Sequence, residues 1–341
     1  MISPREVIRH FLTEEVTITP FGSGHIHKTF KVAGRKNFVL QRVNNNVFKQ
    51  PEIIAQNNRL AYEYLKEKHP GFLFPTTLSG IDGKDLYYDA QGFPWRVFEM
   101  IENTFTMDEV ASEADAFEAA KGFGSLARNL HGIEVEGFKP TLPRFHDLSW
   151  RYEQFTEAWQ QAAESTKQAA RAEIEQAHSF QFLVTEYQQL IQRGSLVLRV
   201  THNDTKINNI LFDSLSRKAV CAIDLDTLMP GYFIYDLGDM VRTFVSPVSE
   251  EEKDLSKVRF RESIYRALLD GYLSEMDFVL TDEEKQSIPF AGKMMTYIMA
   301  LRFLADYLNG NIYYHITYPE QNLVRAANQL KLLQLLQQSV A

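Results

Sequence analysis

Cysteine is almost absent from this chain of 341 residues, which contains only Cys221. A single cysteine can form neither an intramolecular disulfide nor a cysteine-based zinc site. No apolar run approaches the roughly 20 residues that a membrane-spanning helix requires. The N-terminal segment also lacks the positive flank and apolar core of a signal peptide. We therefore expect a cytoplasmic protein without a membrane segment.

Positive charge is the second scarcity. The formal net charge is −8, and no basic run exceeds two adjacent residues outside mixed-charge helices. This balance argues against a surface for nucleic acid or for an anionic membrane. Hydrophobic residues make up 45% of the chain and charged residues 23%, which is ordinary for a folded protein with a sizeable core. The length suggests two domains or lobes.

The pattern of apolar residues changes about one third of the way along the chain. Alternation before residue 102 predicts strands, and helical periodicity predicts one helix in the same part. The predicted strands cover residues 16–19, 28–32, 37–43, 85–90 and 95–99, and the helix covers 52–68. Long helices dominate afterwards, at 108–130, 150–165, 167–192, 250–276, 282–308 and 320–338. We predict an α+β, bilobal fold, with a small antiparallel-sheet lobe (residues 1–101) and a large, mainly helical lobe (residues 102–341).

A polar loop lies between two short predicted strands, residues 196–198 and 210–212. It carries Asp204 and, five positions later, Asn209. A buried strand then ends at Asp224. Phosphoryl-transfer enzymes use this arrangement, with one Asp accepting a proton and an Asn and a second Asp holding metal ions. The loop alone would pass for a polar turn, but a carboxylate ending an apolar strand needs a partner, so we predict catalysis by Asp204 and metal binding by Asn209 and Asp224.

Two further aspartates follow. Asp226 points to the same side as Asp224 in an extended chain, so it is a candidate to share the metals or to contact substrate. Asp236 opens the next helix, where it could cap that helix or brace the catalytic loop. For Asp236 we favour the structural role.

The small lobe supplies candidates for nucleotide binding. Glycines at Gly22 and Gly24, with Ser23 between them, would let the backbone approach phosphates, although a hairpin turn has the same composition. His25 and His27 follow, and one of them is a candidate to face the substrate. Backbone groups around Glu99 and Ile101, where the small lobe ends, are the candidates for adenine.

The third strand should deliver a cation to the phosphates. The position that usually carries Lys is Gln41, and Arg42 beside it is our candidate. Its glutamate partner from the 52–68 helix would be Glu63, or Gln56 or Asn57 would stand in its place. Late in the chain, Arg302 lies within an apolar helix, where either an intrahelical pair with Asp306 or a substrate-facing role explains it.

These motifs resemble the aminoglycoside phosphotransferase and choline kinase superfamily, which has a protein-kinase-like fold. Within it the chain is most similar to the N-acetylhexosamine 1-kinases. The resemblance rests on residues 202–209, 223–231, 238–242 and 301–308. It implies ATP- and Mg2+-dependent phosphorylation of the anomeric hydroxyl of N-acetylglucosamine or N-acetylgalactosamine. It also implies that Asp204 is the base, that Asn209 and Asp224 are metal ligands, and that His27, Arg302 and Tyr313 are candidates for holding the sugar.

Two alternatives remain open at this stage. A kinase of the same fold could act on an amino alcohol, another monosaccharide or an aminoglycoside, because Asp226 and several tyrosines would suit a cationic acceptor. The missing third-strand Lys would also fit a non-catalytic ligand-binding relative. The presence of Asp204, Asn209 and Asp224 together argues against that second alternative.

Overall fold

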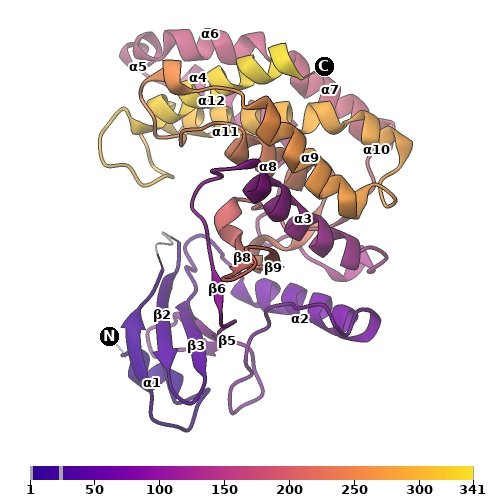
Figure 1. Ribbon diagram of the computed structural model, residues 1–341. Helices are drawn as coiled ribbons and strands as arrows, with labels where there is room; N and C mark the ends of the chain where they lie inside the picture. The colour runs from indigo at the N-terminus through magenta and orange to yellow at the C-terminus, as the bar shows by residue number, and fades with distance from the viewer. Residues whose placement is uncertain (1–2, 23–25, 341) are drawn as a thin grey trace.

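The structure is a computed structural model that describes residues 3–22 and 26–340. It has two lobes, a small one built on an antiparallel sheet and a large one built mainly of helices (Figure 1). The predicted α+β, bilobal architecture is confirmed. The junction between the lobes matters most for the predicted site, because His27 and Arg96 of the small lobe contact Asp226 of the large lobe there.

The small lobe contains one five-stranded sheet in the order β1-β2-β3-β5-β4, and each neighbouring pair is antiparallel. Leu40 and Val97 are fully buried neighbours across β3 and β5, as the alternating pattern predicts. The strands are β1 (Thr17–Pro20), β2 (Lys28–Ala33), β3 (Asn37–Arg42), β4 (Tyr87–Tyr88) and β5 (Pro94–Glu99), and the helices are α1 (Pro4–Ile8) and α2 (Pro51–Lys68).

The large lobe is a stack of helices around one extended hydrophobic core. Its long helices are α3 (Glu113–Asn129), α4 (Leu148–Gln161), α8 (Phe233–Phe244), α9 (Glu262–Met276), α11 (Ile288–Leu308) and α12 (Gln321–Ser339). Shorter ones are α5 (Glu164–Ala169), α6 (Arg171–Ser179), α7 (Phe182–Gln192), α10 (Asp282–Gln286) and the 3-10 turns η1 (Val135–Gly137), η2 (Ile207–Asn209), η3 (Leu225–Thr227) and η4 (Leu255–Lys257).

Two small sheets of the large lobe carry the predicted catalytic segments. Strands β6 (Thr104–Phe105), β8 (Ile210–Asp213) and β9 (Ala219–Ala222) form one, and β7 (Arg199–Thr201) pairs with β10 (Met229–Gly231) in the other. A side chain could not replace the hydrogen of Gly231, because a Cβ there would lie 2.2 Å from Thr201 Oγ1. This close approach seats β10 against the strand that leads into the catalytic loop.

Three predicted helices differ from those observed. The helix predicted at 282–308 is two helices, because Pro289 lies in the first turn of α11 and cannot donate a backbone hydrogen bond. The one predicted at 167–192 is broken near Ala170 and again near Phe180, and both of these residues are buried in the core. The helix predicted from residue 250 begins at Glu262, after an irregular segment.

Strand β6 pairs with β8, so the chain has entered the large lobe by residue 104. We therefore propose to keep the lobe boundary between residues 101 and 102. In the described part of the chain, no helix is both long enough and apolar enough to span a bilayer.

Candidate active site

The catalytic loop and the segment of Asp224 lie side by side, although about twenty residues separate them in sequence. The contact runs through Ile223, whose N–H donates to Asn209 O (2.8 Å) and whose carbonyl accepts from His202 Nε2 (2.8 Å). The β8–β9 hairpin makes this possible, because Ile210 and Ala222 are partners in its register. The structure thus brings Asp204, Asn209 and Asp224 to one place, as the spacing predicts.

Helix α8 braces the loop through Asp236. Its two carboxylate oxygens accept the N–H groups of His202 (3.0 Å) and Asn203 (2.7 Å), and its carbonyl accepts from Thr205 Oγ1. Burial raises the pKa of Asp236 to about 6, although His202 and the two N–H donors act in the opposite direction. The predicted structural role of Asp236 is therefore confirmed.

Asp204 is half-buried and is oriented by two neighbours. Asn209 Nδ2 donates to Asp204 Oδ2 (3.1 Å), and Lys206 Nζ lies 3.2 Å from Oδ1. The carboxylate of Asp204 raises the pKa of Lys206, despite the desolvation of that ammonium. An ionised carboxylate beside a protonated lysine is suited to orient a hydroxyl and accept its proton.

Asp224 faces the cleft, where solvent reaches its side chain. Its backbone is left-handed, with φ 58° and ψ 57°. Its pKa is raised, because desolvation and the nearby charges of Asp226 and Asp204 disfavour the ionised form. Among the described residues it has no ion-pair partner. A divalent cation would offset this excess of negative charge.

The donor atoms suit a hard cation. The Nδ2 of Asn209 donates to Asp204, so its Oδ1 is left without a hydrogen-bond partner among the described residues and is available to a cation. Carboxylate and amide oxygens are the ligands that Mg2+ prefers. Asn209 and Asp224 therefore fit the metal-binding role predicted for them.

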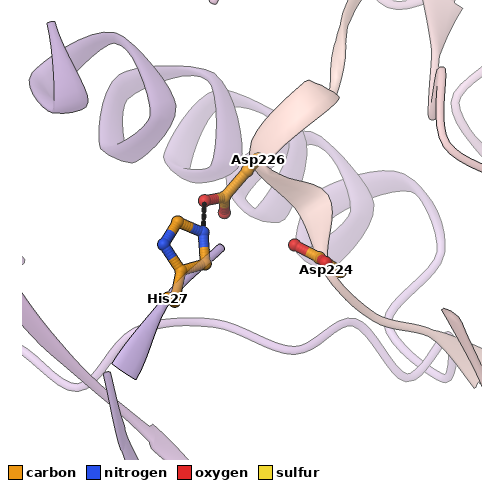
Figure 2. A group of neighbouring side chains, drawn as sticks. All are labelled: His27, Asp224 and Asp226. Atoms are coloured by element: carbon orange, nitrogen blue, oxygen red, sulfur yellow. Dashed lines mark hydrogen bonds and ion pairs between the residues drawn. The ribbon is translucent and has the colours of Figure 1, made fainter. Parts of the chain in front are cut away.

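Asp226 differs from Asp224, since both of its oxygens are engaged. His27 Nε2 lies 2.8 Å from Oδ2 (Figure 2), and Arg96 Nη1 lies 2.6 Å from Oδ1. Burial opposes the ionisation of Asp226, but Arg96 and His27 prevail and hold its pKa well below the usual range. His27, Asp224 and Asp226 lie close enough to hold one ion, yet Asp226 already has its counter-charges.

The described nucleotide-binding candidates lie at or after the ends of small-lobe strands: Gly22 follows β1, Glu99 ends β5 and Ile101 follows β5. Gly22 has φ 79°, a conformation that glycine adopts without strain, while Ser23, Gly24 and His25 lie outside the described residues. Glu99 is exposed and pairs with Lys36 at 2.6 Å. The carbonyl of Ile101 accepts a hydrogen bond from Thr104 Oγ1.

Gln41 stands at the third-strand position that usually carries Lys, and the arginine that contacts it is Arg96, not Arg42. Gln41 Oε1 accepts from Arg96 Nε (3.1 Å) and Nη2 (2.9 Å). Arg42 instead lies over the ring of Phe93, with 4.2 Å from its Cζ to the centroid. Glu63 pairs with Arg59 on its own helix and not with β3.

On the large-lobe side, Arg302 lies among aromatic rings and has no carboxylate partner in the described part of the chain. Its Cζ is 5.1 Å from the Phe145 centroid, 5.5 Å from that of Tyr314 and 6.0 Å from that of Tyr313. The alternative pair with Asp306 does not form. That carboxylate accepts the N–H groups of Tyr313 (2.8 Å) and Tyr314 (3.0 Å) instead.

Sequence reasoning assigned no role to four charged or polar residues that lie in this site. Arg96 and Lys206 contact the predicted carboxylates, while His146 and Arg151 lie beside Arg302. Only Lys206 had a local signal, because it is two residues from Asp204. His146 Nε2 donates to Asn203 O (2.9 Å), and its buried Nδ1 has no hydrogen-bond partner among the residues that the structure describes. Burial lowers the pKa of His146 to about 3.

Comparisons with known proteins agree with this architecture. Residues 17–279 match the family described as "Phosphotransferase enzyme family". The fold is similar to that of a microcompartment-associated aminopropanol kinase (18% identity, 97% of this chain and 95% of the other, TM-score 0.60). It is also similar to an amicoumacin kinase in complex with AMP-PNP and Ca2+ (16%, 99% and 95%, TM-score 0.59). A choline kinase from Streptococcus pneumoniae has 14% identity, coverage of 97% for both chains and a TM-score of 0.57. The TM-scores and coverages indicate a shared, protein-kinase-like fold.

Proposed function

Since this chain belongs to the phosphotransferase enzyme family, we propose that it transfers the γ-phosphoryl group of ATP to an uncharged small-molecule acceptor. The acceptor group that we propose is the anomeric hydroxyl of an N-acetylhexosamine, which gives the sugar 1-phosphate. The observation that best supports phosphoryl transfer is the pair of hydrogen bonds that Ile223 makes with Asn209 and His202. These bonds join the proposed base and the proposed metal-binding residues into one site.

Asp204 is the base in this proposal. Its carboxylate accepts the proton of the acceptor hydroxyl while the hydroxyl oxygen attacks the γ-phosphorus of ATP. The bond from that phosphorus to the bridging oxygen breaks, and ADP leaves with the bonding electrons. Lys206, half-exposed and 3.2 Å from Asp204, is placed to offset charge on the transferred group.

Asn209 and Asp224 would hold Mg2+, which supplies positive charge against the phosphate oxygens when it is bound. The small-lobe residues Gly22, Glu99 and Ile101 remain our candidates for binding the nucleotide, as do Ser23 and Gly24, and Arg42 remains a candidate for its phosphates. The likeness to a kinase whose structure contains AMP-PNP and Ca2+ supports a nucleotide with a divalent cation.

The charge around Arg302 favours an uncharged acceptor over an ammonium compound. Arg151 lies close enough to Arg302 for the two positive charges to repel each other. Burial together with Arg302 lowers the pKa of Arg151 to about 9. The rings that could stabilise an ammonium group by cation–π contact are already occupied by the Arg302 guanidinium. The two arginines, neither of which has an ion-pair partner among the described residues, repel a cation. Arg151 donates to Phe145 O and Gln154 Oε1, so Arg302 is the one we propose to donate to hydroxyl and carbonyl oxygens, which N-acetylhexosamines carry. We propose that Arg302, Tyr313 and His27 hold the sugar, with Asp226 fixing His27.

An acceptor panel with an Asp204 variant tests the proposal. We expect ATP-dependent product with N-acetylglucosamine or N-acetylgalactosamine and none with choline, ethanolamine, aminopropanol or an aminoglycoside. Asp204→Asn should lower kcat by roughly 100- to 10,000-fold, while calorimetry shows unchanged binding of MgADP. Asp213→Asn, which removes a half-exposed carboxylate at the end of β8, is the control. Product with the ammonium acceptors alone, or full turnover by Asp204→Asn, would contradict the proposal.

A further inference from the structure

A buried arginine of the small lobe takes the place left by the missing third-strand lysine. We propose that Arg96 is a positioning residue for the metal site: it holds Asp226, and through Asp226 it sets the Asp224 carboxylate for the cation. This inference rests on the proposed function of Asp224 as a metal ligand.

The first step is the position of Arg96 in the sheet. Gln41 and Arg96 are direct partners across β3 and β5, so the arginine side chain lies beside the position that usually carries Lys. Gln41 receives two hydrogen bonds from Arg96 and donates one to Thr29 Oγ1 (3.3 Å) on β2. The guanidinium also lies 5.0 Å from the ring centroid of Phe98. Three strands and a ring therefore fix the direction of this cation.

The second step is its target. Arg96 Nη1 lies 2.6 Å from Asp226 Oδ1, and both side chains are 3% exposed. Asn44 N donates to His27 Nδ1 (3.0 Å), so the proton of the imidazole is on Nε2, which faces Asp226 Oδ2. With both oxygens engaged by the small lobe, Asp226 is poorly placed to bind a metal. Asp224, which has no ion-pair partner in the described part of the chain, is the carboxylate left for the cation.

The third step is a second contact between the small lobe and the segment of residues 224–228. Asn57 of α2 donates to the carbonyls of Leu228 (2.9 Å) and Lys139 (2.8 Å) in the large lobe. Residues 224–228 are thus held by the small lobe from β5 and from α2. Asp224 begins this segment with its left-handed backbone, so a shift of Asp226 moves the ligand. A kinase lysine performs the comparable task by pairing with a helix glutamate.

Direct contact between Arg96 and the nucleotide phosphates is the competing role. The 3% exposure of its side chain opposes this role, as does the use of three of its nitrogens by Gln41 and Asp226. The two roles differ in one measurable respect. A positioning residue affects nucleotide binding only when the metal is present, whereas a phosphate contact acts with or without it.

The experiment measures ADP binding to the full chain by calorimetry, once with Mg2+ and once with EDTA. Arg96→Met should weaken binding with Mg2+ by about tenfold or more, as expected for loss of a residue that orients a ligand, and leave binding in EDTA within about twofold. Arg96→Lys, which keeps the charge, should restore part of the affinity. Gln41→Ala should give a smaller loss of the same kind, and these two variants cover the case in which Arg96→Met does not fold.

Arg59→Met is the matched control, because it breaks an Arg–Asp pair of the small lobe, with Asp85, away from the cleft. Equal weakening with Mg2+ and with EDTA would overturn the inference in favour of a phosphate contact. Unchanged MgADP binding by Arg96→Met would overturn it outright. This experiment measures nucleotide binding, whereas the acceptor panel measures product. A wrong inference about Arg96 can therefore be told apart from a wrong proposal about the acceptor.

Discussion

Arg96 on β5 of the small lobe and Arg302 on α11 of the large lobe differ in how their charges are balanced. Arg96 has a carboxylate at 2.6 Å and a carboxamide that accepts two of its hydrogen bonds. Arg302 has three aromatic rings, a contact with Met299 Sδ and another arginine as its neighbours. The charge of Arg96 is therefore balanced within the protein. Among the described residues Arg302 has no carboxylate or amide acceptor, and a ligand would supply one.

This difference predicts that variants on the two sides fail in different ways. Removing one member of the Arg96–Asp226 pair should lower stability, because the charge of the other member stays buried. Removing Arg302 should lower acceptor affinity and cost little stability, because no carboxylate of the described residues is left without its partner. The three predictions below test that contrast from the largest expected effect to the smallest.

The largest effect is expected for Asp226→Leu. Removing this carboxylate leaves Arg96 buried and unpaired, which should lower the free energy of unfolding by about 3–5 kcal/mol. Denaturant titration measures it. The double variant with Arg96→Met should recover part of the loss. Asp85→Asn, at the partly exposed Arg59 pair, should cost no more than about 1 kcal/mol, and an equal loss in both single variants would remove the contrast.

Arg302→Met should act on the other side. We expect the acceptor KM to rise roughly 10- to 100-fold, because a charged donor to the ligand is worth about 1.5–3 kcal/mol. The ATP KM should stay within about twofold, and the free energy of unfolding should not fall, because repulsion with Arg151 is relieved. Steady-state kinetics and denaturant titration give both values.

Arg325→Met is the control for this variant, since Arg325 contacts the Phe303 ring and pairs with Glu251. Its acceptor KM should not change. A drop in stability for Arg302→Met as large as that of Asp226→Leu would mean that Arg302 is a structural residue.

The smallest effect concerns His146, whose ring interacts electrostatically with Asp204 and with the two acceptor-side arginines. Its pKa of about 3 in the folded state lies below the ordinary value of 6.5, because the ring is buried and close to the charges of Arg302 and Arg151. The hydrogen bond to the Asn203 carbonyl and the charge of Asp204 act in the opposite direction. The unfolded state therefore binds a proton first as pH falls. The stability that the neutral ring confers is complete above pH 6.5 and is lost between pH 6.5 and about 3.

We expect this group to lower the free energy of unfolding by up to about 1.4 kcal/mol per pH unit across that range. Denaturant titrations at pH 7.5 and 5 should show the fall, and His146→Asn should reduce it. His131→Asn, which changes an exposed histidine, should keep the wild-type slope. Equal slopes in wild type and His146→Asn would show that the ring already carries a proton.

Patterns that repeat along the chain allowed the fold to be predicted. Alternation in β2 and β3 and the 3.6-residue periodicity of α2 are local signals, and both lobes follow from them. The broken helices were missed because the 167–192 segment contains no Gly or Pro, while the signal of Pro289 was outweighed by the apolar periodicity on both sides of it. Burial of Phe180, a tertiary effect, accompanies the second break in the 167–192 segment.

The site residues also fall into those that local sequence patterns predict and those that only the fold brings together. Asp204, Asn209 and Asp224 stand near one another in sequence and have a recognisable spacing. Arg96 and Asp226 are 130 residues apart, and an arginine in a strand usually indicates an exposed position. Only the register of β5 against β3 shows that it points into the protein.

The left-handed backbone of Asp224 affects how its role should be tested. A residue with a Cβ adopts φ near +58° at a cost, and Asn and Asp tolerate it better than other side chains. Alanine scanning, the usual way to probe a ligand, would add a conformational penalty to the loss of the carboxylate at this position. Asn keeps the backbone preference and removes the charge. For the same reason, random mutagenesis libraries should yield few folded variants at residue 224, and the survivors should be enriched in Asn and Gly.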